Sequence, residues 1–203
     1  HELRTPLAVV KIQAQVAQCT VDADDRQHAL NQVLAGTDRA TRVLEQLLRL
    51  ARLDPLARLT HQGEVDLAGL AQRVAAEMWP TVGGRVIRSE TVGSRLTVNG
   101  DAEMLEIVLR NLIDNACRYT SPDSTITVFA NRDDEELSLG VTDDGPGVAP
   151  EELPRLVERF YRGREASAEG SGLGLAIAQR IAELHAARLE LENLAGGGFQ
   201  VRL

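Results

Sequence analysis

Aromatic residues and cysteines are both scarce in this chain of 203 residues, and each scarcity narrows the possible interpretations. Aromatic residues make up only 3% of the sequence, so a folded core has to be built mainly from Leu, Val, Ile and Ala. The two cysteines, Cys19 and Cys117, lie far apart and have no histidines at ligand spacing, which argues against a cysteine-based metal site. We expect two free thiols in a reducing compartment.

The sequence also lacks a basic balance of charge and a long apolar run. Its formal net charge of −8 argues against a nucleic-acid binder, because neutralising phosphates requires a net basic surface. No apolar stretch approaches the length of a membrane-spanning helix, and no signal peptide is visible. Because the chain begins at His1 without an initiator Met, we expect it to be a fragment of a longer protein.

The N-terminal region, residues 1–54, has apolar residues at helical spacing in two runs separated by the polar stretch 20–25. Pro55 ends the second run, because proline cannot continue a helix. This pattern predicts an antiparallel helical hairpin. The apolar stripes are too wide for two helices to bury, so we expect the hairpin to form half of a dimeric four-helix bundle. The alternative is that the stripes pack against the rest of the chain.

Residues 55–63 are predicted to be a linker, and residues 64–203 mix helix and strand patterns in an α+β domain of ordinary size. Amphipathic periodicity predicts helices at 67–79, 101–119 and 173–185. Alternating runs predict strands at 125–130 and 137–142, short strands are expected at 85–89 and 95–98, and a last hairpin is expected from 189–192 and 199–203.

Two glycine-rich segments are candidates for contacts to a nucleotide. Gly170-Ser-Gly-Leu-Gly-Leu175 stands directly before a predicted helix, where glycines let backbone amides approach phosphate oxygens and the helix N-terminus favours an anion. Asp143-Asp-Gly-Pro-Gly147 ends a predicted strand, where a carboxylate can accept the adenine amino hydrogen. Taken alone, each segment is more typical of a tight turn.

Paired amides and a cluster of arginines add candidates for phosphate and metal contacts. Asn111 and Asn115 are four residues apart on a predicted helix, so their oxygens share a face that suits a magnesium ion held together with ATP phosphates. The segment 155–164 has four arginines around an aromatic pair, and guanidinium groups bind phosphate bidentately, which predicts a nucleotide lid. The alternative for both is a solvated helix face.

The N-terminal segment His1-Glu-Leu-Arg-Thr-Pro-Leu7 holds a candidate phosphoryl acceptor. The neutral imidazole of His1 has a nucleophilic nitrogen near neutral pH. Glu2 is adjacent and can hold the other ring N–H and take up its proton. Thr5 lies one helical turn further on, on the same face as His1.

In their order along the chain, these segments resemble the boxes of the sensor histidine kinases of bacterial two-component systems. HELRTPL matches their phospho-acceptor box, NLIDNACRYT their asparagine box, DDGPGV and GSGLGLAI their glycine boxes, and ERFYRG their phenylalanine box. The resemblance covers nearly the whole chain. It implies a dimerisation and histidine phosphotransfer domain at 1–54, and a catalytic domain at 64–203 that is an α/β-sandwich of the GHKL (Bergerat) type.

The resemblance also implies roles for single residues, with ATP and Mg²⁺ as cofactors. His1 would be phosphorylated with Glu2 as its base, Thr5 would orient a water molecule for dephosphorylation, and Asn115 would be the principal magnesium ligand. One departure is Val157, where the phenylalanine box often has a second Phe, which would loosen the packing of the lid. The other implied nucleotide contacts are Asn111, Arg118, Arg162, Gly170, Gly172, Leu173 and Gly174 at the phosphates, Tyr119 near the nucleotide, and Asp143, Gly145 and Gly147 at the adenine.

By this resemblance, the chain is expected to be a homodimeric, ATP-dependent protein histidine kinase that phosphorylates His1. It would pass the phosphoryl group to an aspartate in the receiver domain of a response regulator and also dephosphorylate that regulator. Its parent protein would be anchored in the cell membrane upstream, with this part in the cytoplasm. Two alternatives stay open: an ATPase of the same nucleotide fold, like the mismatch-repair and topoisomerase ATPases, and a relay module that binds nucleotide or a partner without turnover.

Overall fold

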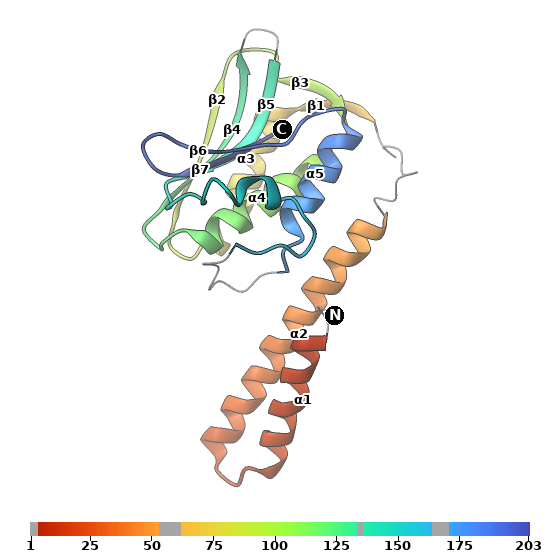
Figure 1. The fold of residues 1–203 in the computed structure, drawn as a ribbon, viewed down its shortest axis with the longest axis vertical. Helices are drawn as coiled ribbons and strands as arrows, with labels where there is room; N and C mark the ends of the chain where they lie inside the picture. The colour runs from red at the N-terminus through yellow and green to blue at the C-terminus, as the bar shows by residue number, and fades with distance from the viewer. Residues whose placement is uncertain (1–3, 53–61, 134–135, 164–170) are drawn as a thin grey trace. The chain divides into compact units, whose positions relative to one another are not determined.

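The computed structural model describes residues 4–52, 62–133, 136–163 and 171–203, and for 4–7, 38–39 and 41–52 it describes only the backbone (Figure 1). The chain divides into two compact units, His1–Asp54 and Pro55–Leu203, which are described separately. Within the described residues, no helix is both long enough and apolar enough to cross a bilayer.

The smaller unit is a hairpin of two packed helices, α1 (Arg4–Cys19) and α2 (Ala23–Arg52), as the sequence predicts (Figure 1). Asp22 starts the second helix, because its Oδ1 accepts the backbone N–H groups of Asp24 at 2.9 Å and Asp25 at 3.0 Å. These hydrogen bonds satisfy amide donors that have no carbonyl partner in the first helical turn.

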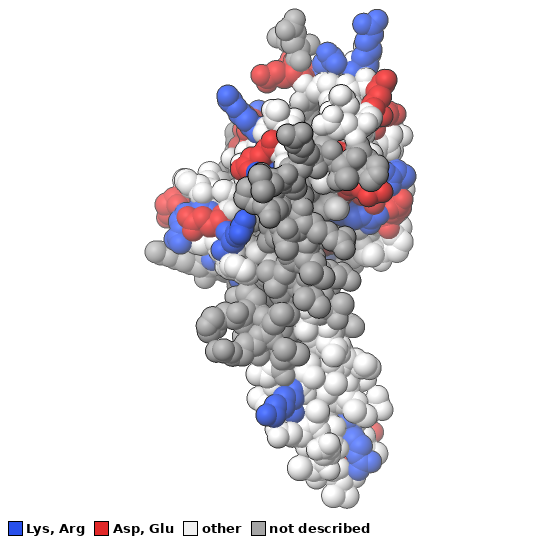
Figure 2. Space-filling view, turned by 90° about the vertical axis from the view of Figure 1, so that its right-hand side faces the viewer, with Lys and Arg blue, Asp and Glu red and all other residues white. Residues whose placement is uncertain are grey.

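One row of apolar residues on α1 is sheltered within the hairpin and a second row is exposed. Val10 and Ala14 are half-buried, whereas Ile12 is 56% exposed. On the second helix, Leu34 is 64% exposed. Most of the described hairpin surface seen in Figure 2 has no charged side chain. Exposed apolar side chains on both helices, such as Ile12 and Leu34, are of the kind that marks an interaction site.

The larger unit contains a five-stranded sheet in the order β2-β4-β5-β7-β6, in which β2 runs parallel to β4 and the other neighbours are antiparallel. A separate antiparallel pair joins β1 to β3. The strands are β1 (Gly63–Asp66), β2 (Val86–Val92), β3 (Thr97–Gly100), β4 (Thr125–Asp133), β5 (Glu136–Asp143), β6 (Glu190–Asn193) and β7 (Phe199–Arg202).

Helices cover one face of this sheet. The helices α3 (Leu67–Met78) and α4 (Ala102–Tyr119) contact its strands, and α5 (Gly174–Leu184) packs along α4 (Figure 1). Strand β4 alternates, with Ile126 and Val128 fully buried in the core beneath the helices. One short 3₁₀ turn, Trp79–Thr81, follows α3. A second one, Leu153–Arg155, leads into the arginine-rich segment 155–164. This arrangement confirms the expected α/β-sandwich.

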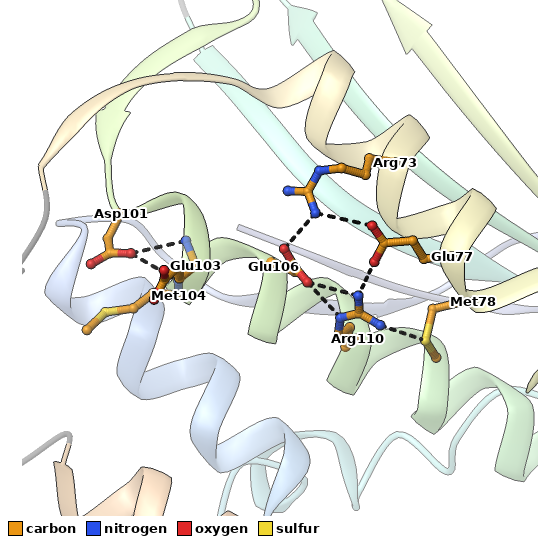
Figure 3. Close-up of polar contacts among 8 residues, drawn as sticks. All are labelled: Arg73, Glu77, Met78, Asp101, Glu103, Met104, Glu106 and Arg110. Atoms are coloured by element: carbon orange, nitrogen blue, oxygen red, sulfur yellow. Dashed lines mark hydrogen bonds and ion pairs between the residues drawn. The ribbon is translucent and has the colours of Figure 1, made fainter.

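The first turns of α3 and α4 are capped by Asp66 and Asp101. A surface ion-pair network joins the two helices, and Figure 3 shows it together with the Asp101 cap. Arg73 and Arg110 both pair with Glu106, at 2.7 Å and 2.9 Å, and both also pair with Glu77. The hydrogen bond from Arg73 lowers the pKa of Glu106. Each of these partly exposed pairs contributes about 0.2–1 kcal/mol, so the network supports helix packing that the buried core has already established.

Two strands differ from the sequence expectation. β1 begins at Gly63, inside the predicted linker, and was not predicted as a strand. β2 runs to Val92, three residues beyond its predicted end, because parallel pairing with β4 continues to Asn131. The other predicted helices and strands agree with the structure to within three residues at their ends.

Candidate functional site

The asparagine pair lies in the middle of α4, where the structure places it partly in the core. Asn111 is only 8% exposed, and within the described part of the chain its Nδ2 has no hydrogen-bond partner. Asn115 lies one turn further on and is half-buried. An unsatisfied buried amide costs about 1–3 kcal/mol, so Asn111 is not part of a solvated face and lacks an acceptor that a ligand can supply.

The second glycine box places the N-terminus of α5 beside Asn111. A Cβ built on Gly174 would lie 3.7 Å from Asn111 Oδ1, so the backbone of the helix start is in close proximity to this amide. The N-cap residue, Leu173, makes no side-chain hydrogen bond to the helix, and the first turn contains no acidic residue. Ser171 Oγ accepts the Leu173 N–H at 3.4 Å, but no described side chain accepts the amides of the first turn from Gly174 onward, which is the arrangement that binds anions.

Gly172 joins this helix start to the phenylalanine box. Its φ of +66° is left-handed, and a Cβ would lie 2.7 Å from the carbonyl carbon of Phe160. The Gly172 carbonyl accepts the Phe160 N–H at 2.9 Å. A side chain at this position would push the two segments apart, so glycine is required here for steric reasons.

The end of β5 holds two adjacent aspartates with different environments. Asp143 is buried, which raises the pKa of its carboxyl group, although the backbone N–H groups of Gly145 and Phe199 donate to it and partly oppose that shift. The Gly145 N–H lies 2.9 Å from Asp143 Oδ1. Asp144 is exposed, and both its oxygens accept the Thr125 N–H at 3.0 Å. Asp144 therefore fixes the start of β4, and Asp143 is the carboxylate available for recognition.

The first glycine box is folded tightly against the C-terminal end of α4. A Cβ on Gly145 would lie 2.8 Å from Asp143 Oδ1 and 2.9 Å from Cγ2 of Thr120, the C-cap of α4. Gly147 has a left-handed φ of +75°. Asn111 and Thr120 thus connect one helix to both glycine boxes, so α4 joins the two halves of the candidate site.

Two side chains that sequence reasoning missed hold this region in place. The Asn193 amide pairs with the backbone of Val148, the last residue of the first glycine box, accepting its N–H at 2.8 Å and donating to its carbonyl at 2.6 Å. Arg85 donates to the Thr120 carbonyl at 2.6 Å and to the Thr120 hydroxyl at 3.0 Å. Both partners lie more than 30 residues away in sequence, and neither residue belongs to a motif.

The basic and aromatic candidates lie around the end of α4 and in the arginine-rich segment. Arg118 is half-buried in the last turn of α4, where Tyr119 is 41% exposed. Arg162 is exposed, and the Arg155 guanidinium lies 4.2 Å from the centre of the Tyr161 ring. Among the described side chains, no three His, Cys, Asp or Glu are grouped to hold a metal ion.

Four of the predicted site residues lie partly or wholly outside the described residues. His1, Glu2 and Gly170 are not described, and Thr5 lies in the first turn of α1 with only its backbone described. Among the remaining candidates, printed distances join Asn111 to Gly174 at the start of α5, and Asp143 to Gly145 at the end of α4.

Two family models match the chain. Residues 100–203 match the family of histidine kinase-, DNA gyrase B- and HSP90-like ATPases, and residues 1–56 match the His Kinase A (phospho-acceptor) domain. The chain is 42% identical over 211 residues to sensor protein QseC of Escherichia coli K12. That alignment covers 100% of the chain and 45% of QseC, so the chain spans less than half the length of this relative.

Solved structures share the fold. Full-length ShkA, solved in complex with AMPPNP, is 28% identical with a TM-score of 0.74, covering 100% of this chain and 43% of ShkA. The histidine kinase ThkA, solved with the response regulator protein TrrA, is 18% identical with a TM-score of 0.79, covering 100% of this chain and 58% of that one. The ThkA likeness shows the fold alone.

Proposed function

The chain belongs to the sensor histidine kinases, and we propose that its larger unit binds ATP with Mg²⁺ to phosphorylate His1 on its helical hairpin. The observation that carries this proposal is the buried amide of Asn111, whose Nδ2 has no partner among the described residues, beside first-turn amides of α5 that no described side chain accepts. A polyanion placed there satisfies the amide and the helix-start donors at once.

The adenine is proposed to bind at the first glycine box. Asp143 is buried and rigidly held by the Gly145 N–H, so its carboxylate can accept a hydrogen from the adenine amino group. Because Gly145 has no side chain, the loop can pack closely against Thr120. The raised pKa of Asp143 reflects a carboxylate deprived of water, which favours a partner that donates a hydrogen bond.

The phosphates are proposed to bind between α4 and the start of α5. The first-turn amides from Gly174 would donate to phosphate oxygens, with Arg118 and Arg162 adding charge-assisted contacts. The Asn115 oxygen would be the principal Mg²⁺ ligand, with Asn111 beside the phosphates, which fits the hard oxygen ligands that this ion requires. Bound Mg²⁺ neutralises charge on the phosphoryl group during transfer.

The proposed reaction is an in-line phosphoryl transfer. A ring nitrogen of His1 bonds to the γ-phosphorus of ATP while the bond from that phosphorus to the β,γ-bridging oxygen breaks, and ADP leaves with the electron pair. Glu2 takes the proton from the other ring nitrogen. The transition state of phosphoryl transfer is loose, with little covalent bonding to the transferred group. The larger unit therefore contributes mainly positioning and charge neutralisation.

The proposed partners are a second copy of this chain and a response regulator. The exposed apolar row with Ile12 and Leu34 supports pairing of two hairpins as a four-helix bundle. The phosphoryl group would then pass from His1 to an aspartate of a receiver domain, and Thr5 would help a water molecule to dephosphorylate that aspartate. We further propose that the parent protein is anchored in the cell membrane, with this part in the cytoplasm.

Labelling with γ-³²P-ATP tests the proposal. The chain with Mg²⁺ is expected to acquire label that is stable in alkali and lost in acid, as a phosphoramidate is. The matched variant His1→Gln is expected to bind ATP with unchanged affinity and to acquire no label. Release of free phosphate without labelled chain would instead indicate an ATPase, and binding without either product would indicate a relay module.

A further inference from the structure

A histidine that belongs to none of the motifs connects α4 and α5, the two helices that form the phosphate half of the proposed site. His185 is the C-cap residue of α5, and its Nε2 accepts the backbone N–H of Asp101, the N-cap residue of α4, at 3.0 Å. Asp101 and its capping contacts are drawn in Figure 3. The two residues are 84 apart in sequence, so this contact depends on the fold.

Both ring nitrogens of His185 are used, which defines the tautomer. The Asp101 N–H can only donate, so Nε2 carries no proton and the proton is on Nδ1. Nδ1 then donates to the Ile181 carbonyl at 2.8 Å, one turn back in α5. The helix end does not need the ring as a cap, because the His185 backbone N–H already bonds to the Ile181 and Ala182 carbonyls.

The contact is tight as well as specific. A Cβ on Gly100, which precedes Asp101, would lie 2.8 Å from His185 Cδ2 and 3.1 Å from Nε2. The ring is therefore wedged against bare backbone, and the start of α4 cannot slide along α5 without breaking the hydrogen bond to Asp101.

The opposite end of the same helix pair is the phosphate site. Gly174, the first residue of α5, lies against Asn111, whereas His185, at its last turn, lies against Asp101, so the helices run antiparallel over this stretch. Eleven residues of α5 rise about 16 Å and ten residues of α4 about 15 Å, so the two spans match. A slip by one residue would move the α5 amides by about 1.5 Å relative to Asn111, which is more than a hydrogen bond tolerates.

We propose that His185 is a positioning residue for the phosphoryl-transfer reaction, setting the register of α5 on α4 and so the spacing between the helix-start amides and the two asparagines. This inference rests on the proposed function. It assigns no contact between His185 and the nucleotide. It predicts that loss of the ring contact weakens binding of the phosphates and leaves adenine recognition, at the other end of α4, unaffected.

Calorimetric titration with Mg²⁺–ATP and with adenosine separates these effects. His185→Leu, which fills the space without an acceptor, is expected to bind Mg²⁺–ATP about tenfold more weakly or worse and to bind adenosine as the parent does. His185→Gln offers an amide oxygen near the position of Nε2 and is expected to recover most of the Mg²⁺–ATP affinity. Asn193→Ala, which releases Val148 beside the adenine half, is the matched control and should weaken adenosine binding.

The outcomes separate failure of this inference from failure of the proposed function. If the parent chain binds no Mg²⁺–ATP, the proposed function is wrong. If the parent binds and His185→Leu binds Mg²⁺–ATP equally well, the register role is wrong. Equal losses of ATP and adenosine in both His185 variants would also overturn it, because they would indicate general unfolding.

Discussion

At the scale of single residues, the neighbouring carboxylates of Asp143 and Asp144 have different roles: one is proposed to recognise the ligand and the other is structural. Asp144 is exposed and holds the start of β4, whereas Asp143 is buried at the first glycine box. The sequence identifies the Asp-Asp pair, and only the resemblance to a family box selected Asp143. The structure supplies a physical reason for that choice, because only the Asp143 carboxylate is desolvated.

Asp143→Asn is expected to weaken ATP binding by about 1–3 kcal/mol, because an amide nitrogen can replace the oxygen that faces the adenine amino group. Its effect on stability should depend on pH. The raised pKa of Asp143 means that its contribution to stability is present below the ordinary pKa, about 3.9, and is lost as pH rises through the raised folded-state value. The stability of the parent relative to the variant should therefore fall between acid and neutral pH in denaturant titrations. Unchanged ATP affinity would contradict the assignment.

Thr5→Ala is expected to separate two activities. A hydroxyl at this position can hold a water molecule for in-line attack on a phospho-aspartate, without contributing to the nucleotide site in the other unit. We expect the variant to keep phosphorylation of His1 and to lose most phosphatase activity, measured as decay of purified phospho-regulator with ADP present. Equal losses in both assays would make Thr5 a structural residue that eases the bend before Pro6.

At the scale of elements, the C-terminal end of α5 has a residue that local geometry disfavours. The Ala186 and Ala187 N–H groups bond to the Glu183 and Ala182 carbonyls, the pattern of a Schellman cap. Ala186 therefore adopts a left-handed φ of 55°, which glycine adopts without steric cost.

Ala186→Gly is therefore expected to raise the free energy of unfolding by about 0.5–1 kcal/mol, because it relieves the strain of a Cβ in the left-handed region. The matched control is Ala187→Gly, the next residue, whose φ is not positive, and it should destabilise the protein. Urea titration of both variants checks this. Similar losses of stability in the two variants would show that the cap geometry is not as described.

How far the elements could be predicted depends on whether their signals are local. The α4 helix was predicted to within a residue, because its apolar periodicity and its Asp101 cap lie within its own sequence. Strand β1 was missed, since its four residues bury only Val65 and its pairing partner β3 lies some 30 residues further on. The edge strand β2 is mostly exposed and lacks alternation, so its far end follows from pairing with β4 and not from its own pattern.

The candidate site divides in the same way. Its proposed ligand-binding residues lie in short motifs that the sequence alone reveals. The residues that hold those motifs in place lie outside the motifs. His185 and Asn193 act across 84 and 45 residues through single side-chain contacts to backbone. Such contacts leave no periodic or compositional signal.

At the scale of the whole molecule, we expect two hairpins to pair and so to bury the exposed apolar row. Ile12→Asp should shift the chain from dimer to monomer at micromolar concentration, because burying an unpaired carboxylate in the bundle costs several kcal/mol. The matched control is Gln18→Asp, an exposed position about 120° around the same helix. Sedimentation velocity distinguishes them, and an unaffected dimer in Ile12→Asp would place the interface elsewhere.

The proposed nucleotide site in the larger unit is expected to phosphorylate His1 in the smaller one. Mass spectrometry of the intact chain and its N-terminal peptide after incubation with Mg²⁺–ATP tests it most directly. We expect added phosphoryl mass at His1, its absence in Asn115→Ala, and its return to ADP as ATP when excess ADP is added. Phosphoryl mass on another residue, or an Asn115→Ala variant that reacts at the parental rate, would show that this site does not phosphorylate His1.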